Sequence, residues 1–166
     1  MLHLLPGCFL FNASQKYNLD DAQAYCQGVE NATLIEIFTE EQLDFFKMAR
    51  FAIEGQDMRK GWWLGGTDRG RDGDFCICNF YFDIISYSYI CREGDWFWMN
   101  SLRPVGDFVW WQTQPSGGLD KNCMHCTVDA GLGFWDGPCD DEYYPVCQRI
   151  VNWHPYNKFV HLISIT

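Results

Sequence analysis

Nine cysteines in a chain of 166 residues constrain this sequence more than any other feature. Such a density is high for a cytosolic protein, whose thiols are kept reduced, and ordinary for an extracellular domain braced by disulfides. Two N-glycosylation sequons, at Asn12 and Asn31, agree with a secreted glycoprotein. The opening MLHLLPGCFLF is too short, and too soon broken by Pro6, to be a secretory signal. Because the cysteine count is also odd, we expect that a segment upstream of Met1, including a partner cysteine, is missing from this sequence.

Length and composition limit the class of protein. A chain of 166 residues is about one domain, and its aromatic content of 17% supplies ample material for a packed core. The formal net charge of −10 repels nucleic acid, so we expect no nucleic-acid partner. An acidic surface is compatible with divalent cations, but it is more often a solvated face.

The periodicity of the chain changes near Gly61. Before this point, Asn18 can cap a helix over residues 19–28. The capping box TEEQ at residues 39–42 begins a second helix that should end by Gly55. Beyond it come short aromatic strands separated by Gly, Asp, Asn and Pro, which we expect at residues 62–65, 96–98, 108–111 and 144–147. Helices followed by strands is the order of an α+β fold.

One apolar segment, residues 74–91, interrupts this order. It contains no Lys or Arg, lies between the similar phrases RDGDF and REGDW, and is shorter than the run of about 20 apolar residues that a membrane-spanning helix needs. Two explanations stay open. Residues 74–93 are either a short intron translated in a gene prediction, or a true aromatic loop insertion in which Cys76 or Cys78 pairs with Cys91.

Four features in a fixed order narrow the fold further. They are Cys26 in the first helix, the WLGG motif at residues 63–66, Gln114-Pro115-Ser116 in a long loop, and the terminal pattern Cys123, FWDGPC at residues 134–139, and Cys147. In order and spacing, residues 8–149 resemble a C-type lectin-like domain, of the type found in secreted invertebrate members of that family. The resemblance implies two helices flanking short antiparallel sheets and a long loop region. Residues 1–7 are then a truncated N-terminal stub, and residues 150–166 a C-terminal tail.

The resemblance also implies two disulfides. Cys26 is expected to pair with Cys147 and tie the ends of the domain, and Cys123 with Cys139 to brace the long loop region. By loop length each contributes about 3 to 5 kcal/mol, mainly by restricting the unfolded chain. Cys8 resembles the second cysteine of an additional N-terminal pair in this family, with its partner upstream of the present sequence.

The long loop is where this family binds calcium and sugar. The ligands come from a Glu-Pro-Asn or Gln-Pro-Asp triplet with a cis peptide before the proline, a Glu ahead of the next cysteine, and a Trp-Asn-Asp triplet. Position by position, Gln114 keeps a ligand carbonyl and Asp136 keeps a carboxylate. Ser116 replaces the acid or amide of the first triplet with a neutral hydroxyl, and Trp135 replaces the Asn of the last one.

The position of the family's Glu decides whether calcium is held. Lys121 matches it by distance from Cys123, but the loop is about one residue shorter, so Asp120 can take the role. At about 6 Å and an effective dielectric near 20, a lysine ammonium repels Ca²⁺ by several kcal/mol. The predicted metal ligands are Gln114, Asp120 and Asp136, and the charge count predicts a degenerate site with weak or absent Ca²⁺ binding.

The resulting prediction is an extracellular, non-enzymatic carbohydrate-recognition module. Its candidate ligand-binding residues are Gln114, Ser116, Asp120, Trp135 and Asp136, whereas Trp63, Trp98 and Trp110 are expected in the core. The alternative is a calcium-independent module that binds a protein or a surface. No nucleophile elbow, phosphate loop or HExxH motif suggests an enzyme. The CMHC motif has no second CxxC, so neither zinc nor redox chemistry is expected. The expected partner is a glycan, a glycoprotein or a protein ligand, with no membrane span.

Overall fold

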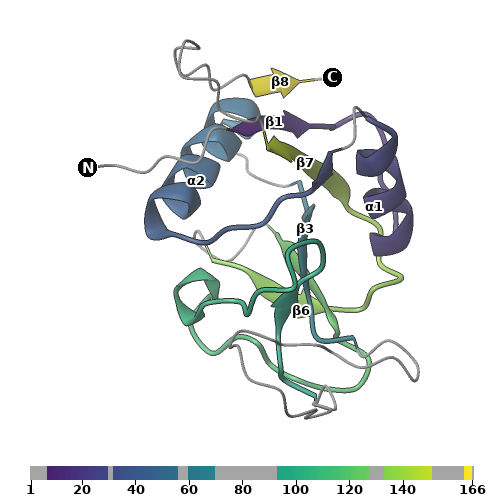
Figure 1. The fold of residues 1–166 in the computed structure, drawn as a ribbon, viewed down its shortest axis with the longest axis vertical. Helices are drawn as coiled ribbons and strands as arrows, with labels where there is room; N and C mark the ends of the chain where they lie inside the picture. Colours follow the sequence, from purple (N-terminus) through teal and green to yellow (C-terminus); the bar gives the residue numbers. More distant parts are fainter. Residues whose placement is uncertain are drawn as a thin grey trace, which may run out of the picture.

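A computed structural model describes residues 7–29, 32–55, 60–69, 93–127, 133–150 and 163–165. The elements are β1 (Gly7–Phe11), α1 (Leu19–Gly28), β2 (Thr33–Leu34), α2 (Glu40–Glu54), β3 (Trp62–Thr67), β4 (Phe97–Trp98), the 3₁₀ helix η1 (Asp107–Val109), β5 (Cys123–Cys126), β6 (Trp135–Gly137), β7 (Tyr144–Ile150) and β8 (Ile163–Ile165). In Figure 1, α1 and α2 lie on opposite sides of β1 and β7, and β6 lies below them in the view. The predicted α+β architecture is confirmed.

The sheet is mixed rather than purely antiparallel. Its strands follow the order β6-β5-β3-β7-β1-β8, with β2 on β7 and β4 on β3. The parallel pairs are β3 with β7 and β1 with β8. The segment expected as a C-terminal tail therefore contributes a strand, since Ile163 pairs with Phe9 at the edge of the sheet.

Both helices begin where the sequence predicts. The Asn18 side chain accepts a hydrogen bond from the first turn of α1, and the Thr39 hydroxyl accepts one from the Gln42 amide at 3.2 Å. The Gln42 side chain reaches one residue further back than in a standard capping box, to the Phe38 amide at 2.7 Å. Helix α2 ends at Gly55, whose φ of 64° is a left-handed conformation that favours glycine.

The strand predicted at residues 108–111 is wrong. The chain forms the 3₁₀ helix η1 there, and Trp110 makes only an isolated bridge to Phe134. The amides of Val109 and Trp110 donate to the carbonyls of Gly106 and Asp107, each at 3.3 Å, so the backbone is satisfied locally. An aromatic run looks the same in sequence whether it pairs with a strand or packs into the core as a turn.

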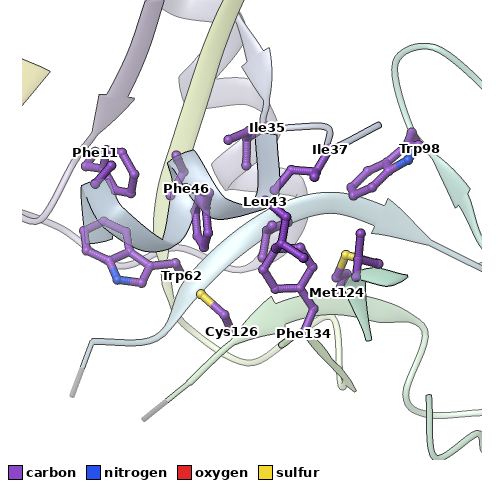
Figure 2. Packing of buried hydrophobic residues seen from close by; sticks show 14 of the residues in the cluster. Phe11, Ile35, Ile37, Leu43, Phe46, Trp62, Trp98, Met124, Cys126 and Phe134 are labelled. Atoms are coloured by element: carbon purple, nitrogen blue, oxygen red, sulfur yellow. The ribbon is translucent and has the colours of Figure 1, made fainter. Parts of the chain in front are cut away.

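An aromatic core connects β1 to β6, the strand that carries Asp136. Phe46 of α2 stacks on Phe11 of β1 with ring centroids 5.8 Å apart, and meets Phe134 edge to face at 5.5 Å. Figure 2 shows Phe46 between Phe11 and Trp62 on one side and Phe134 on the other. Because Phe134 directly precedes β6, this packing fixes the strand on which Asp136 lies.

The expected core tryptophans and both implied disulfides are present. Trp63 and Trp98 are fully buried, and Trp110 is half-buried against Trp96 with ring centroids 4.8 Å apart. The two disulfides have Cα–Cα distances of 5.4 Å and 5.1 Å, and join Cys26 with Cys147 and Cys123 with Cys139. The thiol of Cys126 is free and lies in the core, where burial raises its pKa to about 12. Of the two cysteines in the CMHC motif, Cys123 forms a disulfide and Cys126 is a free thiol in the core.

Other expectations meet the structure only in part. Asn12 of the first sequon is buried, and its side-chain oxygen accepts a hydrogen bond from the Ser14 amide at 2.9 Å. Asn31 and residues 74–92 lie outside the described residues, so the intron and insertion explanations both stay open. Within the described segments, none of the helices is both long enough and apolar enough to cross a bilayer.

Candidate functional site

The site is built on the loop between η1 and β5. Hydrogen bonds from the Trp111 amide to the Phe134 carbonyl, at 3.0 Å, and from the Phe134 amide to the Val109 carbonyl, at 2.9 Å, anchor its start beside β6. The Gln114–Pro115 peptide is cis, as the resemblance implies. Gly117 and Gly118 follow with φ values of 74° and 122°, so only glycine fits this turn without strain. The loop thereby turns back over the end of β6.

Asp136 is the centre of the site. This residue is only 5% exposed, and both of its carboxylate oxygens accept hydrogen bonds from the loop. The Ser116 amide donates to Oδ1 at 2.8 Å, the Gly117 amide donates to Oδ2 at 2.8 Å, and the Ser116 hydroxyl lies 3.1 Å from both oxygens. The carboxylate is therefore satisfied by groups of the chain itself.

The predicted residues Gln114 and Ser116 join the same network. The Ser116 amide, which donates to Asp136, also donates to Gln114 Oε1 at 3.1 Å. The predicted ligand oxygen of Gln114 therefore faces the loop backbone. The Ser116 hydroxyl, which donates to Asp136, accepts from Lys121 Nζ at 3.0 Å. One hydroxyl can do both, because it carries one proton and accepting lone pairs.

Asp120 and Trp135 are not part of this network. Asp120 is exposed beside Gly118, outside the hydrogen bonds that connect the other predicted residues in the described part of the chain. Trp135 precedes Asp136 on β6, and successive side chains of a strand point to opposite faces. The structure thus brings together Gln114, Ser116 and Asp136, and it adds Lys121 as a donor.

Two further acidic residues support the site, Glu93 by bonding the loop and Asp68 by bonding the segment that carries Glu93, and the sequence analysis missed both. Glu93 Oε1 accepts from the Gly118 amide, and Asp68 Oδ2 accepts from the Gly94 amide, each at 2.9 Å. Burial raises the pKa of Asp68, and the negative charges of Glu93 and Asp136 raise it further. A sequence signal existed, since Asp68 lies three residues beyond the strand predicted at residues 62–65 and Glu93 belongs to the REGDW phrase after the interrupting segment.

The arranged residues do not fit a calcium ion. Calcium takes six to eight oxygen ligands, and its affinity rises with the number of charged ones. Here the central carboxylate is occupied by loop donors, and an ammonium group is bonded to the neighbouring hydroxyl. Among the residues that the structure describes, no three or more acidic, His or Cys side chains are placed to hold a metal.

Sequence comparison gives a relative of the expected kind. No protein-family model matches the chain. The chain is 25% identical to human C-type lectin domain family 17, member A, over 142 residues. The matched region covers 86% of this chain and 29% of that protein. The chain therefore spans less than a third of the length of this relative.

Solved structures share the fold over nearly the whole domain. The carbohydrate-recognition domain of mouse scavenger receptor C-type lectin has a TM-score of 0.62 at 19% identity and covers 93% of this chain and 96% of its own. A Ca²⁺-dependent type II antifreeze protein in its Ca²⁺-free form has a TM-score of 0.59 at 26% identity, with 86% and 91% covered. A calcium-independent type II antifreeze protein has a TM-score of 0.59 at 22% identity, with 90% of each chain covered. With its α+β architecture and its two disulfides, the chain has the C-type lectin-like fold.

Proposed function

We propose that this domain is a non-enzymatic binding module that takes its ligand at the loop around Asp136 without using calcium. The observation that carries the proposal is that three donors, the amides of Ser116 and Gly117 and the Ser116 hydroxyl, hydrogen-bond the Asp136 carboxylate. A metal ion would have to displace these donors from a buried carboxylate, and it would also meet the Lys121 ammonium. Repulsion between that ammonium and Ca²⁺ is about 5 kcal/mol at roughly 6 Å and an effective dielectric near 20.

A glycan or glycoprotein is the first ligand class. The carbohydrate-recognition domain of the mouse scavenger receptor lectin supports it, as does a murine dendritic cell receptor domain solved in complex with an N-glycan. Ser116 is exposed and Gln114 half-exposed, so both side chains are within reach of sugar hydroxyls. Asp120 is exposed in the same loop.

A protein ligand is the second candidate, and Leu119 favours it. Its side chain is 86% exposed at the tip of the same loop, between Gly118 and Asp120. An apolar side chain exposed in this way contributes free energy of binding when a protein partner removes it from water. The calcium-independent antifreeze protein of the same fold supports a module of this alternative kind.

We also propose that the domain works outside the cell. Its two disulfides close loops with sequence separations of 121 and 16 residues, and such bonds persist in oxidising compartments.

A glycan array probed with the refolded chain, with and without a chelator, tests the proposed function. Glycan binding that survives the chelator, and that Asp136→Asn abolishes, supports the first ligand class. Asp140→Asn is the matched control, because Asp140 is exposed after the disulfide at Cys139. Binding that disappears with the chelator contradicts calcium independence. A silent array, together with a protein partner whose binding requires Leu119, supports the second class.

A further inference from the structure

The backbone at Lys121 is held in place by the residues on either side of it. Its amide donates to the Gly118 carbonyl at 2.9 Å, which closes a turn over Leu119 and Asp120. Asn122 braces the same turn from below, because its side-chain nitrogen donates to the Leu119 carbonyl at 3.0 Å. One residue later β5 begins at Cys123, which the disulfide to Cys139 fixes. The ammonium therefore projects from an anchored backbone position.

The site is rich in carboxylates. Asp136 and Glu93 accept hydrogen bonds from amides of the loop, and Asp68 accepts one from the Gly94 amide, next to Glu93. Burial chiefly raises the pKa of Asp68, and the charges of the other two acids raise it further, as expected for groups that repel one another. Within the described residues, Lys121 is the cation that hydrogen-bonds into this network, through the Ser116 hydroxyl.

The position of Ser116 makes this contact effective. Its hydroxyl accepts from Lys121 and donates to Asp136, and a hydroxyl that accepts from a charged donor becomes a stronger donor itself. The ammonium thus polarises the Ser116 hydroxyl and strengthens its hydrogen bond to the Asp136 carboxylate. The ammonium carries further N–H donors, which water or a ligand oxygen can accept.

We propose that Lys121 is a positioning residue that acts as a tethered cation, holding Ser116 and Asp136, and with them residues 114–118, in one conformation without a metal ion. The proposal rests on the proposed function, because it assigns the source of order in the same calcium-independent site. It also gives Lys121 the opposite role to the one expected from sequence, where the residue counted only as a repulsive charge.

Hydrogen exchange at the Ser116 and Gly117 amides, followed by NMR on the full chain, tests the role of the ammonium. Lys121→Met should speed exchange at both amides by about five- to tenfold, the range expected when one exposed charged hydrogen bond is lost. Lys121→Arg should restore slow exchange, because it returns a charged donor. Lys47→Met is the matched control, since Lys47 forms an ion pair with the exposed Asp44 on α2 at 3.7 Å. Wild-type exchange in Lys121→Met, or fast exchange in Lys121→Arg, overturns the proposal.

A charge reversal separates this inference from the proposed function. Lys121→Glu should exchange rapidly at the same amides, and millimolar CaCl₂ should slow it again, because the metal then supplies the missing charge. A Lys121→Glu chain that calcium leaves unchanged overturns the tethered-cation role. If calcium slows amide exchange in the wild-type chain, the calcium-independent function is contradicted. If calcium does not change exchange in the wild-type chain and Lys121→Met exchanges at the wild-type rate, only the role of Lys121 is contradicted.

Discussion

The Ser116 hydroxyl lies 3.1 Å from both carboxylate oxygens of Asp136, and so joins a loop to a strand that follows it 20 residues later. Each partner alone is an ordinary polar residue. Together with the amides of Ser116 and Gly117 they form the centre around which the candidate site is built.

Removal of the Ser116 hydroxyl should loosen the site while leaving the fold intact. Ser116→Ala deletes the contact to Asp136 and the relay to Lys121, but it keeps both backbone hydrogen bonds to the carboxylate. We expect a loss of about 1 kcal/mol in the free energy of unfolding, measured by urea titration. Ser101→Ala is the control: Ser101 is half-buried in a turn, its hydroxyl accepts only a long hydrogen bond of 3.4 Å from the Arg103 amide, and the change should be less than about 0.5 kcal/mol. Equal losses in the two variants would argue against the relay.

A buried ion pair at the end of α2 should dominate stability among the charged contacts. Arg50 Nε lies 2.9 Å from Glu54 Oε1 with both side chains nearly inaccessible, and Glu54 also accepts from the Lys60 amide and the Trp62 indole. Glu54→Gln leaves the Arg50 charge buried without its counter-ion, so we expect a loss of about 3 to 5 kcal/mol.

An exposed pair on the same helix provides the comparison for Glu54. Asp44 and Lys47 lie 3.7 Å apart with the Asp44 side chain 72% exposed, so Asp44→Asn should cost less than about 0.5 kcal/mol. Thermal unfolding of both variants measures the difference. Similar melting temperatures would show that the Arg50–Glu54 pair contributes no more than a surface pair.

His125 should make stability fall in mild acid. The imidazole lies between Tyr143, stacked at 4.7 Å, and Trp63, and burial lowers its pKa to about 4 from 6.5 despite the nearby charges of Asp141 and Asp136. Because the unfolded chain binds the proton first, the native state loses stability as pH falls from about 6.5 to about 4, by up to about 3 kcal/mol.

Replacement of His125 isolates this effect from other groups. The raised pKa of Asp68 acts in the opposite direction, since the folded chain then binds its proton first as pH falls. His125→Phe should flatten the loss of stability between pH 6.5 and 4 measured by urea titration, and leave any contribution of Asp68 in place. An unchanged pH slope in His125→Phe would mean that another group is responsible.

Cys126 should resist modification until the domain unfolds. It is 1% exposed, and burial raises the pKa of its thiol to about 12, so thiolate is scarce and inaccessible at neutral pH. Iodoacetamide should label Cys126 only in denaturant, as read by mass spectrometry of its tryptic peptide. Labelling of the native chain at the rate of an exposed thiol would contradict its place in the core.

The domain should fold without residues 70–92, which contain the interrupting apolar segment. The Gly94 amide donates to Asp68 Oδ2 at 2.9 Å, so the chain before residue 70 lies beside the chain after residue 92. Replacement of residues 70–92 by a short glycine-serine turn should give a chain that folds with both disulfides, assayed by mass spectrometry and circular dichroism. Failure to form the disulfides would show that the segment is required. Sequencing of the spliced transcript separately decides between the intron and the insertion.

The sequence by itself determined the frame of this protein. The helix caps at Asn18 and Thr39 act within a few residues, and the order of the cysteines is a property of the chain alone, so both could be read locally. The sequence also grouped Gln114, Ser116 and Asp136 as candidate site residues, because their order and spacing resemble a known pattern, and the structure joins the three by hydrogen bonds.

Only the tertiary structure decided what these residues do. Lys121 points into the site because Gly117 and Gly118 turn the loop over Asp136, and Trp135 leaves it because strand alternation on β6 sends neighbouring side chains to opposite faces. The roles of Glu93 and Asp68 depend on contacts between segments 24 or more residues apart. Side-chain direction at such a site is set by packing between distant segments, and no local pattern in the sequence contains it.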